Sequence, residues 1–328
     1  VSGLLVAFEP WAAFLTGTIM SEQLFMPIFL LSVYSFIRYL KYNLRNYFYL
    51  SALFFGVATL TRPYILFFWP IIAITVFFKK QRFSESLKIV TLATLIFIFI
   101  IAPWVIRNKI VLDTWQLSSV QGFSLYVLNF NTLQVYLGKF KSLDDGYIRA
   151  YKITPDSSVT SKEGSKILMK EALEGIRQNI STYIKISILS LPNFFVSNSY
   201  SSLGYYLGLK EFKIHSQVFG FIKTGHFSQA WNKILNISWG ERILLVSGFF
   251  WPIITVLFLT GAVVSLLKFK PINLGIIYLL GIIFYFDAIT HLMPELARFR
   301  IMAQPFIFIF AVIGIFYFTD LYQRFKHN

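Results

Sequence analysis

The chain has 328 residues, of which 56% are hydrophobic and 19% aromatic, while only 14% are charged. A soluble domain carries about 25% charged residues, so this composition excludes an ordinary soluble protein. The apolar runs are continuous rather than alternating, which excludes a transmembrane β-barrel. Because the chain contains no cysteine, a disulfide framework, a thiol nucleophile and a cysteine metal site are excluded as well.

Eight apolar runs approach the roughly 20 residues that cross a bilayer as a helix. In chain order they cover residues 1–18, 21–40, 46–61, 64–78, 87–106, 243–267, 273–291 and 299–320. The predicted fold class is therefore an all-α polytopic membrane protein with about eight transmembrane helices and an extracytoplasmic insert. We expect an N-terminal bundle of five spans over 1–106, an extracytoplasmic loop domain over 107–242 and a C-terminal bundle of three spans over 243–328.

The formal net charge of +15 is concentrated in short turns between the apolar runs. Four basic clusters fall on one side of the membrane if every span crosses it: Arg38–Arg45, Lys79–Lys88, Lys268–Lys270 and Arg324–Lys326. The positive-inside rule assigns that side to the cytoplasm. We therefore expect the start of the chain and the C-terminus to be cytoplasmic and 107–242 to lie outside. The same rule accounts for the charge without a nucleic-acid partner.

The segment 107–242 is too long for a structureless loop. Within it, the stretch TSKEGSKILMKEALEGIRQN (160–179) predicts a helix that begins with a capping box formed by Thr160 and Glu163. An apolar stripe at helical spacing follows, and we expect this helix to lie along the membrane surface or across the top of the bundle. The stripe consists of Leu168, Ala172 and Ile176, and it is continued by Ile180, Ile184 and Ile188.

Signals for metal and nucleotide binding are weak. His291 and Glu295 are one helical turn apart and could form a ligand pair, but a hydrogen bond at a helix end is the favoured interpretation. The sequence Asp144-Asp145-Gly146 could bind a cation, although a solvated turn is favoured. No metal site is predicted, no cofactor is assigned, and a divalent cation is left open. The glycines of GIIYLLG (275–281) are interpreted as packing positions between spans rather than as a nucleotide loop.

Five ionisable residues lie between the last two apolar runs: Asp287, His291, Glu295, Arg298 and Arg300. The positive-inside rule should deplete arginine from short outer turns, yet Arg62, Arg107, Arg298 and Arg300 are all predicted there. Arginine binds phosphate oxygens in pairs through its planar fork. The pattern favours a site for a lipid-linked phosphate, and a solvated turn whose arginines reach lipid head groups is the alternative.

Glu22 begins the second predicted span, in GTIMSEQLFMP. It could be a base, a supporting carboxylate or the ion-pair partner of an arginine, and spacing alone does not separate these roles. We expect Glu22 and Arg62 to point into one outward-opening cavity, because either group is costly in hydrocarbon. Arg298 and Arg300 would point the same way in an extended turn. In a helix they would diverge by about 200°, and we then expect Arg298 to face the site.

Four stretches distributed over nearly the whole chain carry a resemblance to a known family. They are SEQLFMPIFLLSVYSFIRYL, LSALFFGVATLTRPYILFFWPII, IAPWVIRNKIVLDTWQLSSVQGFSLYVLN and HLMPELARFRIMAQPFIFIFAVIG. Together they resemble bacterial members of the glycosyltransferase C superfamily, of the dolichyl-phosphate-mannose protein mannosyltransferase type that includes the lipid A aminoarabinose transferases. The resemblance implies an enzyme of the plasma (bacterial inner) membrane that moves a sugar, with inversion, from a polyprenyl-phosphate carrier to an acceptor on the outer face.

The resemblance also implies roles for individual residues. Glu22 matches an acidic residue that starts a later span, Arg62 matches the carrier-phosphate residue of the LTRP turn, and Arg298-Phe299-Arg300 matches an Arg-Tyr-Arg-type motif. The principal catalytic base belongs to a first outer loop that is expected upstream of Val1. The sugar is not specified, and the acceptor could be a protein hydroxyl, lipid A or a cell-wall glycan. A lipid-linked sugar transporter or flippase, and a non-catalytic membrane scaffold, are the alternative functions.

Overall fold

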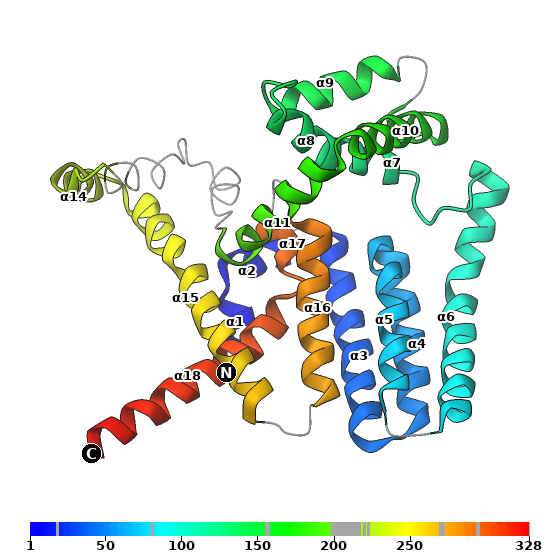
Figure 1. The fold of residues 1–328 in the computed structure, drawn as a ribbon, viewed down its shortest axis with the longest axis horizontal. Helices are drawn as coiled ribbons and strands as arrows, with labels where there is room; N and C mark the ends of the chain where they lie inside the picture. The colour runs from blue at the N-terminus through cyan, green and yellow to red at the C-terminus, as the bar shows by residue number, and fades with distance from the viewer. Residues whose placement is uncertain are drawn as a thin grey trace.

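The computed structural model describes residues 1–17, 20–79, 82–154, 158–197, 218, 221, 224–268, 273–292 and 296–327. All regular secondary structure in these ranges is helical. The helices form an elongated bundle with a second group of helices above one end, which we call the outer domain (Figure 1). The described part of the chain is thus all-helical, as predicted.

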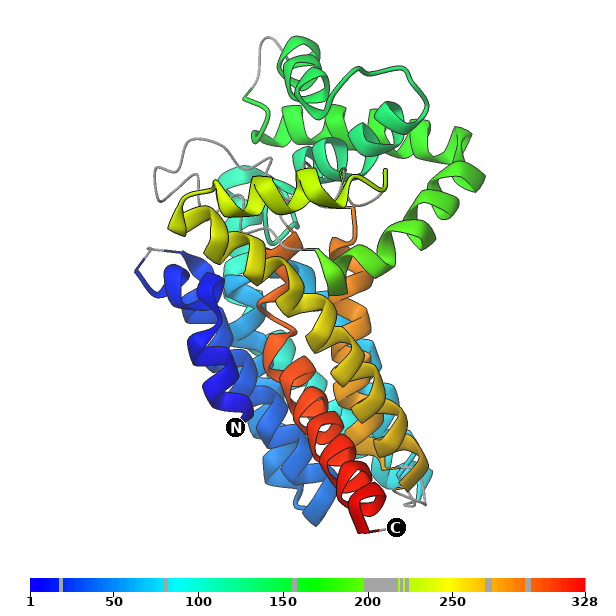
Figure 2. The same cartoon turned by 90° about the vertical axis from the view of Figure 1, so that its left-hand side faces the viewer.

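The first predicted span, 1–18, is not one continuous helix. It consists of α1 (Ser2–Phe8) and α2 (Pro10–Thr16), separated by Glu9 in an extended conformation with φ −68° and ψ 123°. Pro10 explains the break, because proline disfavours the α conformation in the residue before it. The buried Glu9 carboxylate accepts a hydrogen bond from the Ala12 backbone N–H at 2.7 Å. The chain start lies partway along the bundle in Figure 2 rather than at its end.

The next four helical segments run alternately down and up the bundle (Figure 1). They are α3 (Ser21–Tyr42), α4 (Arg45–Thr61), the pair η1 (Pro63–Phe68) and α5 (Trp69–Phe77), and α6 (Phe83–Leu112). Lys41 at the end of α3, Arg45 at the start of α4 and Arg82 just before α6 lie at the end remote from the outer domain. The start of α3 and the end of α4 lie at the opposite end, next to the outer domain.

The outer domain has its own hydrophobic core around Tyr126, Leu133 and Leu168. Its elements are α7 (Gln121–Ser124), the π-helical turn η2 (Leu125–Phe130), α8 (Asn131–Tyr136), α9 (Leu143–Ile153) and α10 (Lys162–Gln178). The predicted helix over 160–179 is present as α10, which lies across the top of the bundle (Figure 1). Its predicted stripe of Leu168, Ala172 and Ile176 is buried.

Two details of the predicted outer helix are wrong. The cap is Ser161, whose Oγ accepts from the Gly164 N–H at 3.0 Å, while the Thr160 hydroxyl lies 3.1 Å from that of Ser158. The stripe also does not continue, because Asn179 ends α10 and a separate helix, α11 (Ile180–Val196), turns toward the bundle. The three isoleucines expected to extend the stripe are exposed: Ile180, Ile184 and Ile188.

The chain returns through α14 (Phe227–Leu235) and α15 (Trp239–Lys268), which runs the length of the bundle. The last elements are α16 (Leu274–Thr290), the short α17 (Leu296–Arg300) and α18 (Gln304–His327). The end of α15, the start of α16 and the end of α18 lie at the end of the bundle remote from the outer domain (Figures 1 and 2). Of the basic residues expected at that end, Lys80 and Lys270 fall outside the described residues.

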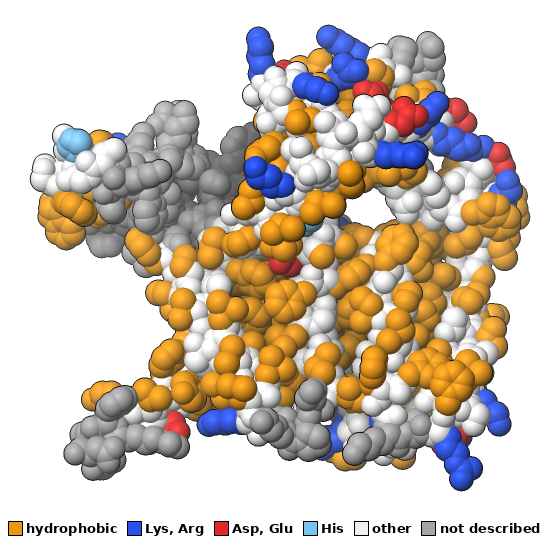
Figure 3. Space-filling model, viewed as in Figure 1, with side chains coloured by type: hydrophobic (Ala, Val, Ile, Leu, Met, Phe, Trp, Pro, Cys, Tyr) orange, Lys and Arg blue, Asp and Glu red, His pale blue; other side chains and the backbone are white. Residues whose placement is uncertain are grey.

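Four helices in the described residues are long and apolar enough to cross a membrane. They are α3, α6 and the segments Phe249–Lys268 of α15 and Gln304–Gln323 of α18. Shorter apolar helices cover Pro63–Phe77, Ile180–Val196 and Leu274–Thr290. The predicted count of eight spans is therefore not reproduced by length and composition. Figure 3 shows one face of this bundle covered by hydrophobic side chains, with Lys and Arg side chains gathered at the two ends.

The glycines that allow close helix packing are not those of GIIYLLG. A Cβ on Gly261 of α15 would lie 1.8 Å from the Phe310 carbonyl oxygen of α18, and one on Gly314 of α18 would lie 2.2 Å from the Leu257 carbonyl oxygen of α15. These two helices therefore meet backbone to backbone, as small residues permit in membranes. In contrast, a Cβ on Gly281 would have no atom within 4 Å.

Candidate phosphate-binding site

A buried carboxylate bridges two arginines at the end of the bundle next to the outer domain. Glu22, in the first turn of α3, is 2% exposed. Its Oε1 accepts a hydrogen bond from Arg298 Nε at 2.6 Å, and its Oε2 forms an ion pair with Arg62 Nη2. The three residues come from α3, the end of α4 and α17, so the cluster joins segments up to 276 residues apart in sequence.

The turn that carries Arg62 is shaped by Pro63. Arg62 ends α4 with φ −138° and ψ 89°, which agrees with the preference of a residue before proline for non-helical conformations. Two hydrogen bonds then hold the turn against neighbouring elements. The Tyr64 hydroxyl donates to Met302 Sδ at 2.5 Å, and the Tyr285 hydroxyl of α16 donates to the Tyr64 carbonyl oxygen at 2.5 Å.

Arg298 and Arg300 point in different directions because α17 is helical. Arg298 faces Glu22 and its side chain is 31% exposed. Arg300 has no exposed surface. Its Nη1 donates to the carbonyl oxygens of Phe194 at 2.8 Å and Ser197 at 2.7 Å, at the end of α11. The helical alternative for this turn is therefore the one observed, and only Arg298 joins the cluster.

The charge of the cluster is unbalanced. Among the described residues, two guanidinium groups share one carboxylate, which gives these three side chains a formal charge of +1 in a partly buried position. In addition, the buried Arg62 Nε has no hydrogen-bond acceptor among the described residues. A buried donor without an acceptor costs roughly 1–3 kcal/mol. The arrangement can therefore accept an anion, and the exposed part of Arg298 is accessible to it at the end of the bundle next to the outer domain.

The remaining predicted site residues do not contact Glu22 through any bond that the structure records. Arg107 is exposed on α6, where its Nη1 donates to Asn108 Oδ1 at 3.0 Å. The His291 ring Nδ1 lies 2.9 Å from the Ala288 carbonyl oxygen, at the end of α16. Glu295 lies outside the described residues, so the proposed His291–Glu295 pair stays a prediction.

Asp287 is 2% exposed, and its Oδ1 has no hydrogen-bond partner among the described residues. It follows Tyr285 by two positions in α16, and two residues of an α-helix are separated by about 200°. Because Tyr285 contacts the Arg62 turn, Asp287 faces away from the arginine cluster. The described residues contain no group of three or more His, Cys, Asp or Glu side chains that could hold a metal ion.

Sequence reasoning missed the residues that position this cluster. Tyr64 and Tyr285 stand inside apolar runs, where an aromatic residue is most often part of the core. The contact of Arg300 with the end of α11 was also missed, because it joins residues 103 and 106 positions apart. Pro63 was the one local signal that the helix ends at Arg62 and that the backbone leaves the helical conformation there.

Residues 1–106 match the family model described as dolichyl-phosphate-mannose-protein mannosyltransferase. This segment includes Glu22 and Arg62 and agrees with the family that the sequence motifs resemble. Comparison with curated proteins and with solved structures found no match. Residues 1–106 are thus related to a family of membrane glycosyltransferases, and the chain is an integral membrane protein.

Proposed function

We propose that the protein takes part in sugar transfer from a polyprenyl-phosphate carrier to an acceptor on the outer face of the membrane, and that Arg62 and Arg298 bind the carrier phosphate. The observation that carries the proposal is the buried Glu22, which holds these arginines together at one end of the apolar bundle. A polyprenyl phosphate has its charged group at the membrane surface and its tail in hydrocarbon, which suits a cationic site at the end of a bundle.

The cations would act on the leaving group. In the transfer, the acceptor oxygen forms a bond to the anomeric carbon while the bond from that carbon to the phosphate oxygen breaks, and the electron pair leaves with the phosphate. Guanidinium groups stabilise the negative charge that accumulates there. The proton of the acceptor hydroxyl passes to a carboxylate base.

Glu22 suits a positioning role better than the role of that base. Each of its oxygens already contacts a guanidinium, which stabilises the ionised form and occupies the groups that would receive a proton. We therefore assign Glu22 to the orientation of Arg62 and Arg298. The base therefore belongs to another residue.

Donor binding by the purified protein in lipid nanodiscs tests the proposal. We expect Arg298→Ala to weaken binding of a polyprenyl-phosphate mannose by about 10- to 150-fold, which corresponds to the roughly 1.5–3 kcal/mol of a hydrogen bond to a charged group. Polyprenyl phosphate without the sugar should compete with the donor, because the site recognises the phosphate.

Arg107→Ala is the matched control, because it removes the same charge from an exposed position on α6. It should leave donor affinity unchanged. If folded Arg62→Ala and Arg298→Ala proteins both bind the donor as tightly as the unmodified protein, the cluster is only structural and the proposal is wrong.

A further inference from the structure

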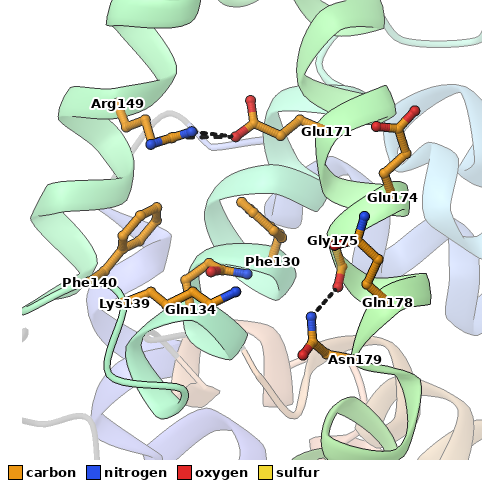
Figure 4. Close-up of a pocket in the computed structure, with 10 residues that line it drawn as sticks. All are labelled: Phe130, Gln134, Lys139, Phe140, Arg149, Glu171, Glu174, Gly175, Gln178 and Asn179. Atoms are coloured by element: carbon orange, nitrogen blue, oxygen red, sulfur yellow. Dashed lines mark hydrogen bonds and ion pairs between the residues drawn. The ribbon is translucent and has the colours of Figure 1, made fainter.

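The outer domain contains a cavity of about 380 Å³ that lies outside the arginine cluster. Its walls come from η2, α8, the turn between α8 and α9, α9 and the end of α10, and its residues surround a common space in Figure 4. Small-molecule sites have volumes of roughly 300–1,000 Å³. The cavity is therefore large enough for a small ligand, and nothing in the proposed phosphate chemistry uses it.

The shape of the cavity depends on close packing at its floor. Phe130, the last residue of the π-helical turn η2, packs against Gly175 of α10. A Cβ on Gly175 would lie 2.2 Å from Phe130 Cε2, so only glycine allows this approach. π-helical turns are rare and often occur at functional sites. The half-buried ring of Phe140 stands over the same space, with its centroid 6.4 Å from that of Phe130.

The polar lining is balanced in charge. Lys139 and Arg149 contribute two positive charges, and Glu171 and Glu174 contribute two negative ones. Arg149 Nη2 is bound to Glu171 Oε1 at 3.1 Å. A phosphate or a carboxylate ligand would require an excess of cations, so the lining favours a neutral ligand.

The lining also contains three side-chain amides, from Gln134, Gln178 and Asn179. An amide both donates and accepts hydrogen bonds, as does a hydroxyl group. The aromatic rings of the lining offer apolar contact to a ligand. The amides and the oppositely charged side chains offer hydrogen-bond donors and acceptors beside these rings. A neutral ligand with alternating C–H surface and hydroxyl groups satisfies all of these features.

We propose that this cavity binds a neutral saccharide. The further assignment of that saccharide as part of the transfer acceptor rests on the proposed function, whereas the binding itself does not. Such a site would hold a glycan above the membrane surface, on the same side of the bundle as the arginine cluster (Figure 1).

Calorimetric titration of the full chain in nanodiscs, without any lipid donor, tests the inference. The probes are mannotriose, maltotriose and tri-N-acetylchitotriose. We expect saturable binding of at least one of them with a Kd of about 1 mM. Gln178→Ala removes an exposed amide and Phe140→Ala removes the ring, and each should weaken binding at least about tenfold.

Tyr151→Ala is the matched control, since Tyr151 is an exposed aromatic residue of α9 that does not line the cavity. It should leave the affinity unchanged. The inference is overturned if no trisaccharide binds at about 20 mM, if inorganic phosphate binds in their place, or if Tyr151→Ala weakens binding as much as Gln178→Ala. Arg298→Ala separates the two proposals, because it should weaken donor binding and leave saccharide binding intact.

Discussion

Arg300 has no exposed surface, and its guanidinium carbon lies 3.4 Å from the centroid of the Trp251 ring. Nη1 of the same side chain donates to two carbonyl oxygens at the end of α11. These contacts place a permanent charge in an aromatic and polar surrounding that connects α11, α15 and α17. Arg300 is therefore bound within the protein, whereas Arg298, two residues earlier, faces Glu22.

Replacing Arg300 by Ala should reduce stability without a selective effect on donor binding. Each carbonyl left without a donor costs roughly 1–3 kcal/mol, so we expect a lower thermal midpoint in a detergent unfolding assay. The folded fraction should bind the polyprenyl-phosphate donor with unchanged affinity. A stable Arg300→Ala protein that has lost donor binding would contradict this division between the two arginines.

Asp287 presents the opposite case, a buried carboxylate with no contact to a cation among the described residues. Burial of an unpaired charge is costly, and an amide of the same shape avoids that cost. Asp287→Asn should therefore leave the thermal midpoint unchanged or raise it. A fall as large as that of Arg300→Ala would mean that the Asp287 carboxylate is stabilised by a charged partner, and the interpretation of Asp287 as unpaired would be wrong.

At the scale of elements, helices α15 and α18 cross where Gly261 and Gly314 bring their backbones together. Alanine at either position would collide with a backbone carbonyl oxygen of the other helix. Because the colliding atom belongs to the backbone, no side-chain movement can relieve the clash. We expect Gly261→Ala and Gly314→Ala to lower the thermal midpoint. Gly281→Ala is the control, because it meets no atom within 4 Å and alanine favours a helix by about 1 kcal/mol over glycine. Equal losses in all three variants would contradict a specific packing role.

Sequence patterns identified most helices of the bundle, because a long continuous apolar run is best explained by a helix that spans a membrane. They failed where a single polar residue or proline interrupts a run, as at Glu9 and Pro10, and where isoleucine spacing continued past Asn179. The packing glycines were also misassigned. Whether a glycine contacts another helix depends on which faces of the two helices pack together. The residues next to the glycine in the sequence do not determine this packing.

The candidate site was predictable to a similar degree. Glu22, Arg62 and Arg298 stood out because charged groups at the ends of apolar runs are costly unless they pair. The same argument selected Arg107 and Arg300 as well, and Arg298 was favoured over Arg300 only under the helical alternative for their turn. That separation depends on the helical conformation of α17 and on contacts with α11, which form only when distant parts of the chain assemble.

At the scale of the whole molecule, the basic residues predict which end of the bundle faces the cytoplasm. Lys41, Arg45 and Arg82 lie at the end remote from the outer domain, together with Lys268 (Figure 1). Basic residues in short loops are retained in the cytoplasm during insertion. The outer domain, the arginine cluster and the saccharide cavity should therefore all be extracytoplasmic.

Single-cysteine labelling, measured on the protein purified after labelling, can test this orientation because the sequence has no cysteine that would react in place of the introduced one. Lys166→Cys places a thiol on the exposed surface of α10, and Asn46→Cys places one in the exposed turn at the start of α4. In intact cells, a membrane-impermeant maleimide should label the first variant and leave the second unlabelled. After permeabilisation both should react, which controls for access to each thiol. The reverse pattern would place the arginine cluster on the cytoplasmic side, and transfer at the outer face would then be excluded.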